Sequence, residues 1–532
     1  MAHAIECLTV ARSESAVVPR NHVRKIKDFM DGKSTSYDAA AASALDEETI
    51  AVWEAFWDAH FAPKTAGELK IAYLAGPEPL NDFRVLIELG VHPFNIWAFE
   101  TDNPTYNAAL MEVAESEFPL LKLRRGSLDA FLRTAPTVFD IIYLDACGPL
   151  PSTGQSTLRT LVDIFRYNGL ASPGVLITNF AAPDESDEQQ ASAYADLVSA
   201  SLYPRPFLEA PSDSEVDSAE TWNMDDGPQA HGFVCKDQMN TDESFFHEVR
   251  KDLQSYYGQY ITRQIFDVAS LIAPWTVFAN SEAWNLYLKE PASKVAASSA
   301  DFGPSPEDDV TVLVTDSDMN AIGWTLNASK NGKPYDDVNY PILETGSVKL
   351  IDSWRKQLSG QPTPKVSAEQ ALIAYHVIRS EEQAFETPAF DAILNGFRYL
   401  DKMFLFCDVP NDELALLPLV AQYTRPMHYN VERTRRFSYV AKSTRMFMDV
   451  VPFDACRYVY DWLPPVDMAP SAFELENFQL AFRFALDGIA KHTIRYNREY
   501  FFGVHVAGVN HEGFCEKLLK PRKEIGEPNN AL

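Results

Sequence analysis

Five short apolar runs alternate with helix-like segments between residues 69 and 180, and this alternation constrains the fold more than any other feature. Helix-like segments lie between the runs and have recognisable ends, such as Gly90 after 79–89 and the N-cap candidate Asn103 before Pro104. Strands that alternate with helices need parallel crossovers, so the pattern predicts an α/β sheet with helices on both faces. The runs are Ile71–Leu74, Ile96–Phe99, Leu120–Leu123, Phe139–Leu144 and Gly174–Phe180.

The remaining sequence predicts more than one domain, because 532 residues exceed the usual size of a single one. We interpret residues 1–67 as an N-terminal helical cap, with a helix at 46–61, and residues 68–289 as the α/β domain. The polar stretch 290–309 has the composition of a linker, and 310–532 is expected to form a mostly helical α+β region for recognition or interaction. Further helices are expected at 188–202 and 243–272, and further strands at 232–235, 310–314 and 321–326.

Charge and cysteine usage exclude several classes of protein. The net charge of −29 opposes broad, nonspecific binding to a phosphate backbone. Six scattered cysteines without a C-x-x-C pair fit a reducing cytosol and predict no metal site. The chain shows neither a signal-peptide core nor an apolar run long enough to span a membrane, so we expect a cytoplasmic protein without membrane contact. The G-x-G-x-x-G, P-loop, H-E-x-x-H and G-x-S-x-G motifs are also absent.

A basic segment, residues 425–447, stands out in this acidic chain because its only acid is Glu432. Arginines interleaved with aromatic residues can hold phosphates and stack exposed bases, so RNA or another single-stranded nucleic acid is one candidate partner. Two alternatives are an intramolecular dock for the acidic N-terminal part of the chain and a surface for a protein partner. The candidate substrate-binding residues are Arg433, Arg435, Arg436 and Tyr439.

The order of elements in 69–180, beginning with IAYLAGPEPLND, resembles the class I S-adenosylmethionine-dependent methyltransferases. The resemblance implies a Rossmann-like sheet and S-adenosylmethionine as cofactor. In that family a glycine-rich turn after the first strand wraps the methionine end of the cofactor. Here the turn keeps Gly76 as its single glycine, beside Glu78, and departs from the family at Pro77 and Pro79. Gly76 and Glu78 are therefore assigned to cofactor binding.

Four further residues are assigned to the cofactor by the same resemblance. Glu100, at the end of IWAFETD, would accept hydrogen bonds from the two ribose hydroxyls, with Asp102 as an alternative. Ser127 and Asp129, in LKLRRGSLDAFL, would lie near the adenine, or else would cap a short helix.

Asp145 is the candidate catalytic residue, at the end of the apolar run in FDIIYLDACGPLPS. An acid at the carboxyl end of such a strand projects into the crevice of an open α/β sheet, where it can orient a methyl acceptor or receive its proton. Cys147 is a second candidate, as a nucleophile, although a lone cysteine in an apolar turn is more often inert packing. The motif lacks the aromatic residue of D-P-P-Y, so adenine N6 methylation is not indicated.

These observations lead to two hypotheses. The first is an S-adenosylmethionine-dependent methyltransferase of unknown acceptor, with RNA or another nucleic acid favoured. The second is a catalytically inactive methyltransferase-like scaffold or sensor subunit of a larger protein assembly.

Overall fold

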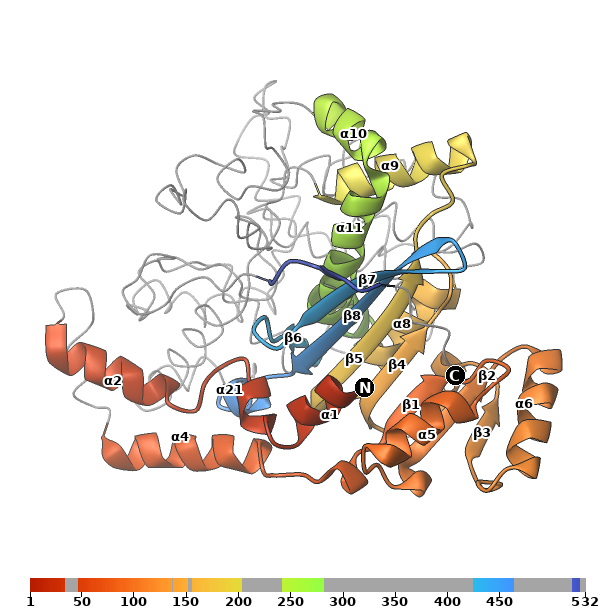
Figure 1. Cartoon of the computed structure of the whole chain (residues 1–532). Coiled ribbons are helices and arrows are strands. Elements are labelled where there is room, and N and C mark those ends of the chain that lie inside the picture. Colours follow the sequence, from red (N-terminus) through yellow and green to blue (C-terminus); the bar gives the residue numbers. More distant parts are fainter. Residues whose placement is uncertain are drawn as a thin grey trace, which may run out of the picture.

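A mixed nine-stranded sheet forms the centre of the molecule (Figure 1). The computed structural model describes residues 1–33, 46–135, 137–151, 156–202, 242–281, 424–463 and 519–526. The strand order is β3-β2-β1-β4-β5-β8-β7-β9, and β6 pairs with β8 outside this path. The strands are β1 (Ile71–Leu74), β2 (Ile96–Glu100), β3 (Lys122–Arg125), β4 (Phe139–Asp145), β5 (Leu170–Ala181), β6 (His428–Tyr429), β7 (Arg435–Ala441), β8 (Thr444–Asp454) and β9 (Lys523–Glu524).

Strands β1 to β5 are parallel and confirm the expected α/β, Rossmann-like fold class. Each expected apolar run contributes to one of them, although β3 begins two residues later than its run and β5 begins earlier, at Leu170. The chain builds outward from β1 to β3 and then crosses to β4 on the other side of β1. In open α/β sheets this switch point is where ligands bind, beyond the carboxyl ends of the strands.

Helices cover both faces of the sheet, as expected from the sequence. The helix expected at 46–61 and the one expected at 188–202 are confirmed, whereas 243–272 is divided into two α-helices and a π-helical turn. None of the described helices is long and apolar enough to cross a membrane. The helices are α1 (Ala2–Leu8), α2 (His22–Lys33), α4 (Glu47–His60), α5 (Leu80–Glu88), α6 (Asn103–Glu115), α7 (Leu128–Thr134), α8 (Ser156–Arg166), α9 (Glu188–Leu202), α10 (Asp242–Lys251), α11 (Leu253–Asp267), α12 (Ala273–Ala279) and α21 (Arg457–Tyr460).

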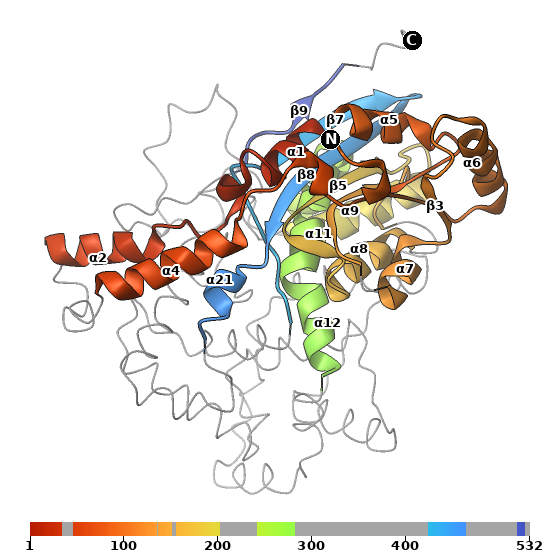
Figure 2. The ribbon, with the colours of Figure 1, turned by 90° about the horizontal axis from the view of Figure 1, so that it is seen from below.

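Figure 2 shows α1 and α5 on one side of the sheet and α7, α8, α11 and α12 on the other. On the first side, alternate residues of the strands, such as Ile71 and Ile141, pack against Phe83 and Leu86 of α5. On the second side, the strand residues that point the other way include Phe99. The centre of its ring lies 5.2 Å from the centre of the Phe131 ring on α7. The central strands are therefore buried on both faces, which explains their nearly continuous apolar runs.

The N-terminal residues, which the sequence analysis interpreted as a cap, contribute directly to this core. Ala4, Ile5, Cys7 and Leu8 of α1 are buried in the same cluster as the central strands. The rest of this segment packs elsewhere, since Trp57 of α4 contacts α21. Residues 1–8 thus belong to the sheet layer rather than to a separate unit.

The basic segment forms an antiparallel hairpin that completes the sheet. β8 pairs with β5 from Gly174↔Phe453 to Ala181↔Met446, and β7 pairs with β8. The sequence analysis assigned these residues to a C-terminal region of their own, whereas the structure places them inside the central sheet, between β5 and β9. The expected linker at 290–309 and the expected strands at 232–235, 310–314 and 321–326 lie outside the described residues.

Candidate functional site

The site lies at the carboxyl ends of the parallel strands, around the switch point between β1 and β4. Gly76 follows β1, Asp145 ends β4, and Asn179 lies near the end of β5, opposite Asp145 in the strand register. The predicted catalytic aspartate and the predicted glycine turn are thus at one edge of the sheet. This edge is the place where a doubly wound sheet holds a ligand.

Asp145 accepts three hydrogen bonds from neighbouring side chains. Asn179 Nδ2 donates to Oδ1 at 3.0 Å, and Cys147 Sγ donates to the same oxygen at 3.3 Å. The Tyr143 hydroxyl donates to Oδ2 at 3.2 Å. A carboxylate offers about four lone-pair positions, so these contacts orient Asp145 and leave room for roughly one more donor.

Tyr439 joins this group from β7, on the far side of β8. Its hydroxyl accepts a hydrogen bond of 2.8 Å from Asn179 Nδ2, so the same amide group bridges Tyr439 and Asp145. Asn179 is 2% exposed, and its Oδ1 has no hydrogen-bond partner within the described part of the chain. Tyr439, predicted as a substrate-binding residue, therefore lies beside the predicted catalytic residue.

Burial and the charge of Asp145 keep the surrounding hydroxyl and thiol groups protonated. Burial, and then Asp145, raises the pKa of Cys147 to about 11 and raises the pKa of Tyr143 well above its ordinary value. Burial also raises the pKa of Tyr439. A thiol with a raised pKa is a weak nucleophile, which favours the inert role for Cys147 over the nucleophilic one.

The turn after β1 has the backbone conformation that favours glycine. Gly76 has φ +59°, and a Cβ at this position would meet no atom within 4 Å. The buried hydroxyl of Tyr73 donates a hydrogen bond of 2.5 Å to the Pro79 carbonyl at the end of this turn. Pro77 and Pro79 contribute no N–H, and the exposed Glu78 accepts from Asn81 Nδ2 at 2.8 Å. The turn is open to a ligand but poor in donors.

Glu100 and Asp102 lie at the end of β2, on the side of the switch point away from Asp145. Glu100 is half-buried, and its Oε1 accepts the backbone N–H of Asp102 at 2.8 Å. Asp102 accepts from the backbone and hydroxyl of Thr105 at 2.9 and 2.7 Å and is the N-cap of α6. The prediction of Asn103 as the N-cap was therefore wrong by one residue, because the carboxylate of Asp102 accepts the free N–H at the start of the helix.

Ser127 and Asp129 have structural partners at the start of α7. Ser127 is the N-cap of this helix and accepts from the Ala130 N–H at 3.4 Å. Asp129 is 2% exposed and forms ion pairs with Arg133 and, at 3.4 Å, with Arg159. These contacts correspond to the capping alternative, and contact with an adenine stays a prediction.

The three predicted substrate-binding arginines contact other parts of the chain. Arg433 forms ion pairs with Glu6, at 3.2 Å, and with Glu14. Arg436 is buried and donates to the Lys520 carbonyl at 3.0 Å, and Arg435 donates to nearby backbone carbonyls. The contacts of Arg433 favour the alternative in which the basic segment docks the acidic N-terminal residues.

Sequence reasoning missed three residues of this site: Tyr143, Asn179 and Asp82. Asp82 lies in the first turn of α5, and burial, followed by the charge of Asp145, raises its pKa. An amide inside an apolar strand, as in LITNF, is a signal that indicates Asn179. Within the described ranges, no three His, Cys, Asp or Glu side chains are grouped closely enough to hold a metal ion.

Comparisons with known proteins give weak structural similarity and no match in sequence. No protein-family model matches the chain, and no curated protein matches it. Two solved structures of an O-methyltransferase domain, StiE O-MT, are similar at 11% identity and a TM-score of 0.18. They cover 41% and 46% of this chain, and 86% and 85% of their own chains. The mixed sheet with its central parallel core is compatible with a methyltransferase-like fold.

Proposed function

We propose that the chain is an S-adenosylmethionine-dependent methyltransferase whose site lies at the carboxyl edge of the sheet between β1 and β4. The observation that carries the proposal is that Gly76 follows β1 and Asp145 ends the adjacent strand β4, on the two sides of the switch point. A cofactor wrapped by the turn after β1 would therefore lie next to an oriented carboxylate.

The residues around the turn fit this cofactor in two respects. The space around Gly76 is open, so a ligand can approach the backbone closely. Glu100 uses Oε1 for the Asp102 N–H, and its second carboxylate oxygen has no hydrogen bond within the described ranges. We assign Glu100 to the ribose hydroxyls and Gly76 to the methionine end, with Glu78, Asp102, Ser127 and Asp129 as further predicted contacts.

The chain's own residues would act mainly by positioning. When bound, S-adenosylmethionine supplies an electrophilic methyl group. Asp145 would accept a hydrogen bond from the O–H or N–H of the methyl acceptor and so orient it, in the place that its three present donors leave open. Asn179 and Tyr143 hold the carboxylate in one orientation.

The acceptor proposed from the sequence is RNA or another nucleic acid, bound through the basic segment. Tyr439 lies at the site, and Arg435 is half-exposed and donates hydrogen bonds to neighbouring backbone carbonyls. A partner protein at the same segment is the alternative. A methylation screen of RNA, DNA and protein acceptors separates these classes.

Calorimetric titration of the full chain with S-adenosylmethionine and S-adenosylhomocysteine tests the proposal. We expect micromolar binding that Glu100→Ala abolishes and that Glu115→Ala, an exposed acid on α6, leaves unchanged. Asp145→Asn should keep cofactor binding but abolish methyl transfer. Absence of heat and of a thermal shift at millimolar ligand would exclude the enzyme.

The inactive scaffold remains a second candidate because of one observation. The Tyr73 hydroxyl donates a hydrogen bond to the Pro79 carbonyl, which holds the turn in place, and Pro77 and Pro79 leave the turn with fewer N–H donors for a ligand. If this turn binds no cofactor, simultaneous substitution of Gly76, Glu100, Asp129 and Asp145 should leave the biological role intact. The titration above distinguishes the two candidates.

A further inference from the structure

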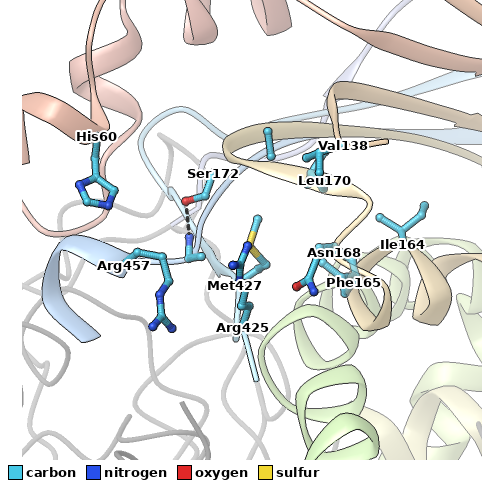
Figure 3. A pocket seen from close by; sticks show the side chains of 12 residues that line it. His60, Val138, Ile164, Phe165, Asn168, Leu170, Ser172, Arg425, Met427 and Arg457 are labelled. Atoms are coloured by element: carbon cyan, nitrogen blue, oxygen red, sulfur yellow. Dashed lines mark hydrogen bonds between the residues drawn. The ribbon is translucent and has the colours of Figure 1, made fainter. Parts of the chain in front are cut away.

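A cavity lies at the opposite edge of the sheet from Asp145, where β5 begins and β8 ends. Its volume is about 240 Å³, roughly that of eight water molecules at liquid density. Twelve residues line it, contributed by α4, α8, β5 and α21 and by the segments next to β4, β6, α8 and α21 (Figure 3). They are His60, Val138, Ile164, Phe165, Asn168, Leu170, Ala171, Ser172, Arg425, Met427, Ala455 and Arg457.

The lining separates into apolar walls and a cationic side. Ile164, Phe165 and Leu170 are buried apolar side chains, whereas Arg425 is exposed. Figure 3 shows His60 and Arg457 on one side, Asn168 and Phe165 on the other, and Arg425 between them. No acid is among the twelve residues, although the chain carries a net charge of −29. The cavity therefore combines an apolar body with a positive side.

Arg425 carries the charge that is left uncompensated. It forms no ion pair or hydrogen bond within the described part of the chain. Arg457, by contrast, pairs with Asp461 and lies 5.9 Å from the centre of the Tyr460 ring. His60 Nδ1 donates to the Phe56 carbonyl at 2.9 Å, which leaves Nε2 as the ring atom able to meet a ligand.

Ser172, a polar residue of the lining, already has hydrogen-bond partners. Ser172 Oγ donates to Asp454 at 3.1 Å and accepts the Ala455 N–H at 2.9 Å. Asp454 also accepts from the Tyr458 hydroxyl and the Val17 N–H. A ligand would therefore gain polar contacts from the cationic side and from Asn168, and apolar contacts at the walls.

We propose that this cavity binds a small organic carboxylate with an apolar body. The carboxylate would meet the guanidinium of Arg425, whose planar fork matches two carboxylate oxygens. The body would lie against Ile164, Phe165 and Leu170. A single uncompensated arginine and apolar walls suit a monoanion better than a strongly hydrated dianion. The site is independent of the function proposed above, because it lies at the other edge of the sheet.

Ligand-observed saturation-transfer NMR on the full chain tests this proposal with benzoate as the probe. For nine non-hydrogen atoms we expect a dissociation constant on the order of 1 mM. Benzyl alcohol, which keeps the ring but lacks the charge, and acetate, which lacks the ring, should each bind at least about tenfold more weakly.

Two variants and one control locate the bound probe. Arg425→Gln should weaken benzoate binding at least about tenfold, and Val138→Trp, which enlarges a partly exposed lining residue, should block it. Arg84→Gln, an exposed arginine on α5, should leave binding unchanged. Equal benzoate binding in Arg425→Gln and the unchanged chain, or no binding at about 10 mM, would overturn the proposal.

Discussion

An ion pair between Arg522 and Asp449 connects three distant parts of the chain, and we expect its two halves to contribute unequally to stability. Asp449, on β8, is fully buried, and its Oδ1 accepts from Arg522 Nη1 at 2.6 Å. Its Oδ2 accepts from the Thr262 hydroxyl at 2.6 Å. Arg522 also donates to the Gly258 carbonyl on α11 at 2.8 Å and to the Phe437 carbonyl on β7 at 3.0 Å.

The asymmetry follows from what each substitution leaves behind. Arg522→Met leaves a buried carboxylate with one neutral donor, Thr262, and an unpaired buried charge of this kind costs about 3–5 kcal/mol. Asp449→Asn leaves a guanidinium that is 12% exposed and keeps its carbonyl acceptors, so the loss should be about 1.5–3 kcal/mol. The double variant contains no unpaired charge, so it should be more stable than the sum of the two losses predicts.

Urea unfolding followed by tryptophan fluorescence measures these differences as shifts of the midpoint. Arg124→Met, at an exposed position of the edge strand β3, serves as the control and should change the free energy of unfolding by less than about 0.5 kcal/mol. Additive losses in the double variant, or a smaller loss for Arg522→Met than for Asp449→Asn, would refute the reasoning.

Three further predictions concern single side chains. Asp102→Ala removes the N-cap carboxylate of α6, which accepts the Thr105 N–H. It should lower the free energy of unfolding by about 1 kcal/mol, as measured by chemical denaturation. Burial lowers the pKa of His428 to about 3. As the pH falls, His428 of the unfolded chain is protonated before His428 of the folded chain. The stability that neutral His428 contributes is therefore complete above about pH 6.5, and the free energy of unfolding falls by up to about 1.4 kcal/mol per pH unit towards pH 3. His428→Gln should remove this contribution from the measured dependence of stability on pH. Cys147 should react with iodoacetamide at pH 8 at least about tenfold more slowly than an ordinary exposed thiol, because burial and Asp145 raise its pKa to about 11, and Asp145→Asn should accelerate the labelling seen by mass spectrometry.

The parallel half of the sheet was predictable because its strands are buried on both faces. Runs such as Phe139–Leu144 have no polar alternation, and helices with clear ends separate them. The hairpin of β7 and β8 was not predicted. Lys442 and Ser443 form its two-residue turn at φ 48° and 70°, where Asn-Gly is the usual signal. With charged residues on both sides of this turn, the segment resembled a ligand surface more than a pair of strands.

The candidate site could be predicted only where its residues follow the parallel strands. Gly76 and Asp145 were found because chain order alone brings strand ends to the same edge. Tyr439 reaches Asn179 across β8, since Asn179 pairs with Met448, which pairs with Phe437, two residues from Tyr439. About 260 residues separate the two side chains, and their contact depends on the register of two antiparallel pairings. A shift of either register by one residue would turn Tyr439 or Asn179 to the opposite face, so the polar contacts around Asp145 are set by the sheet as a whole.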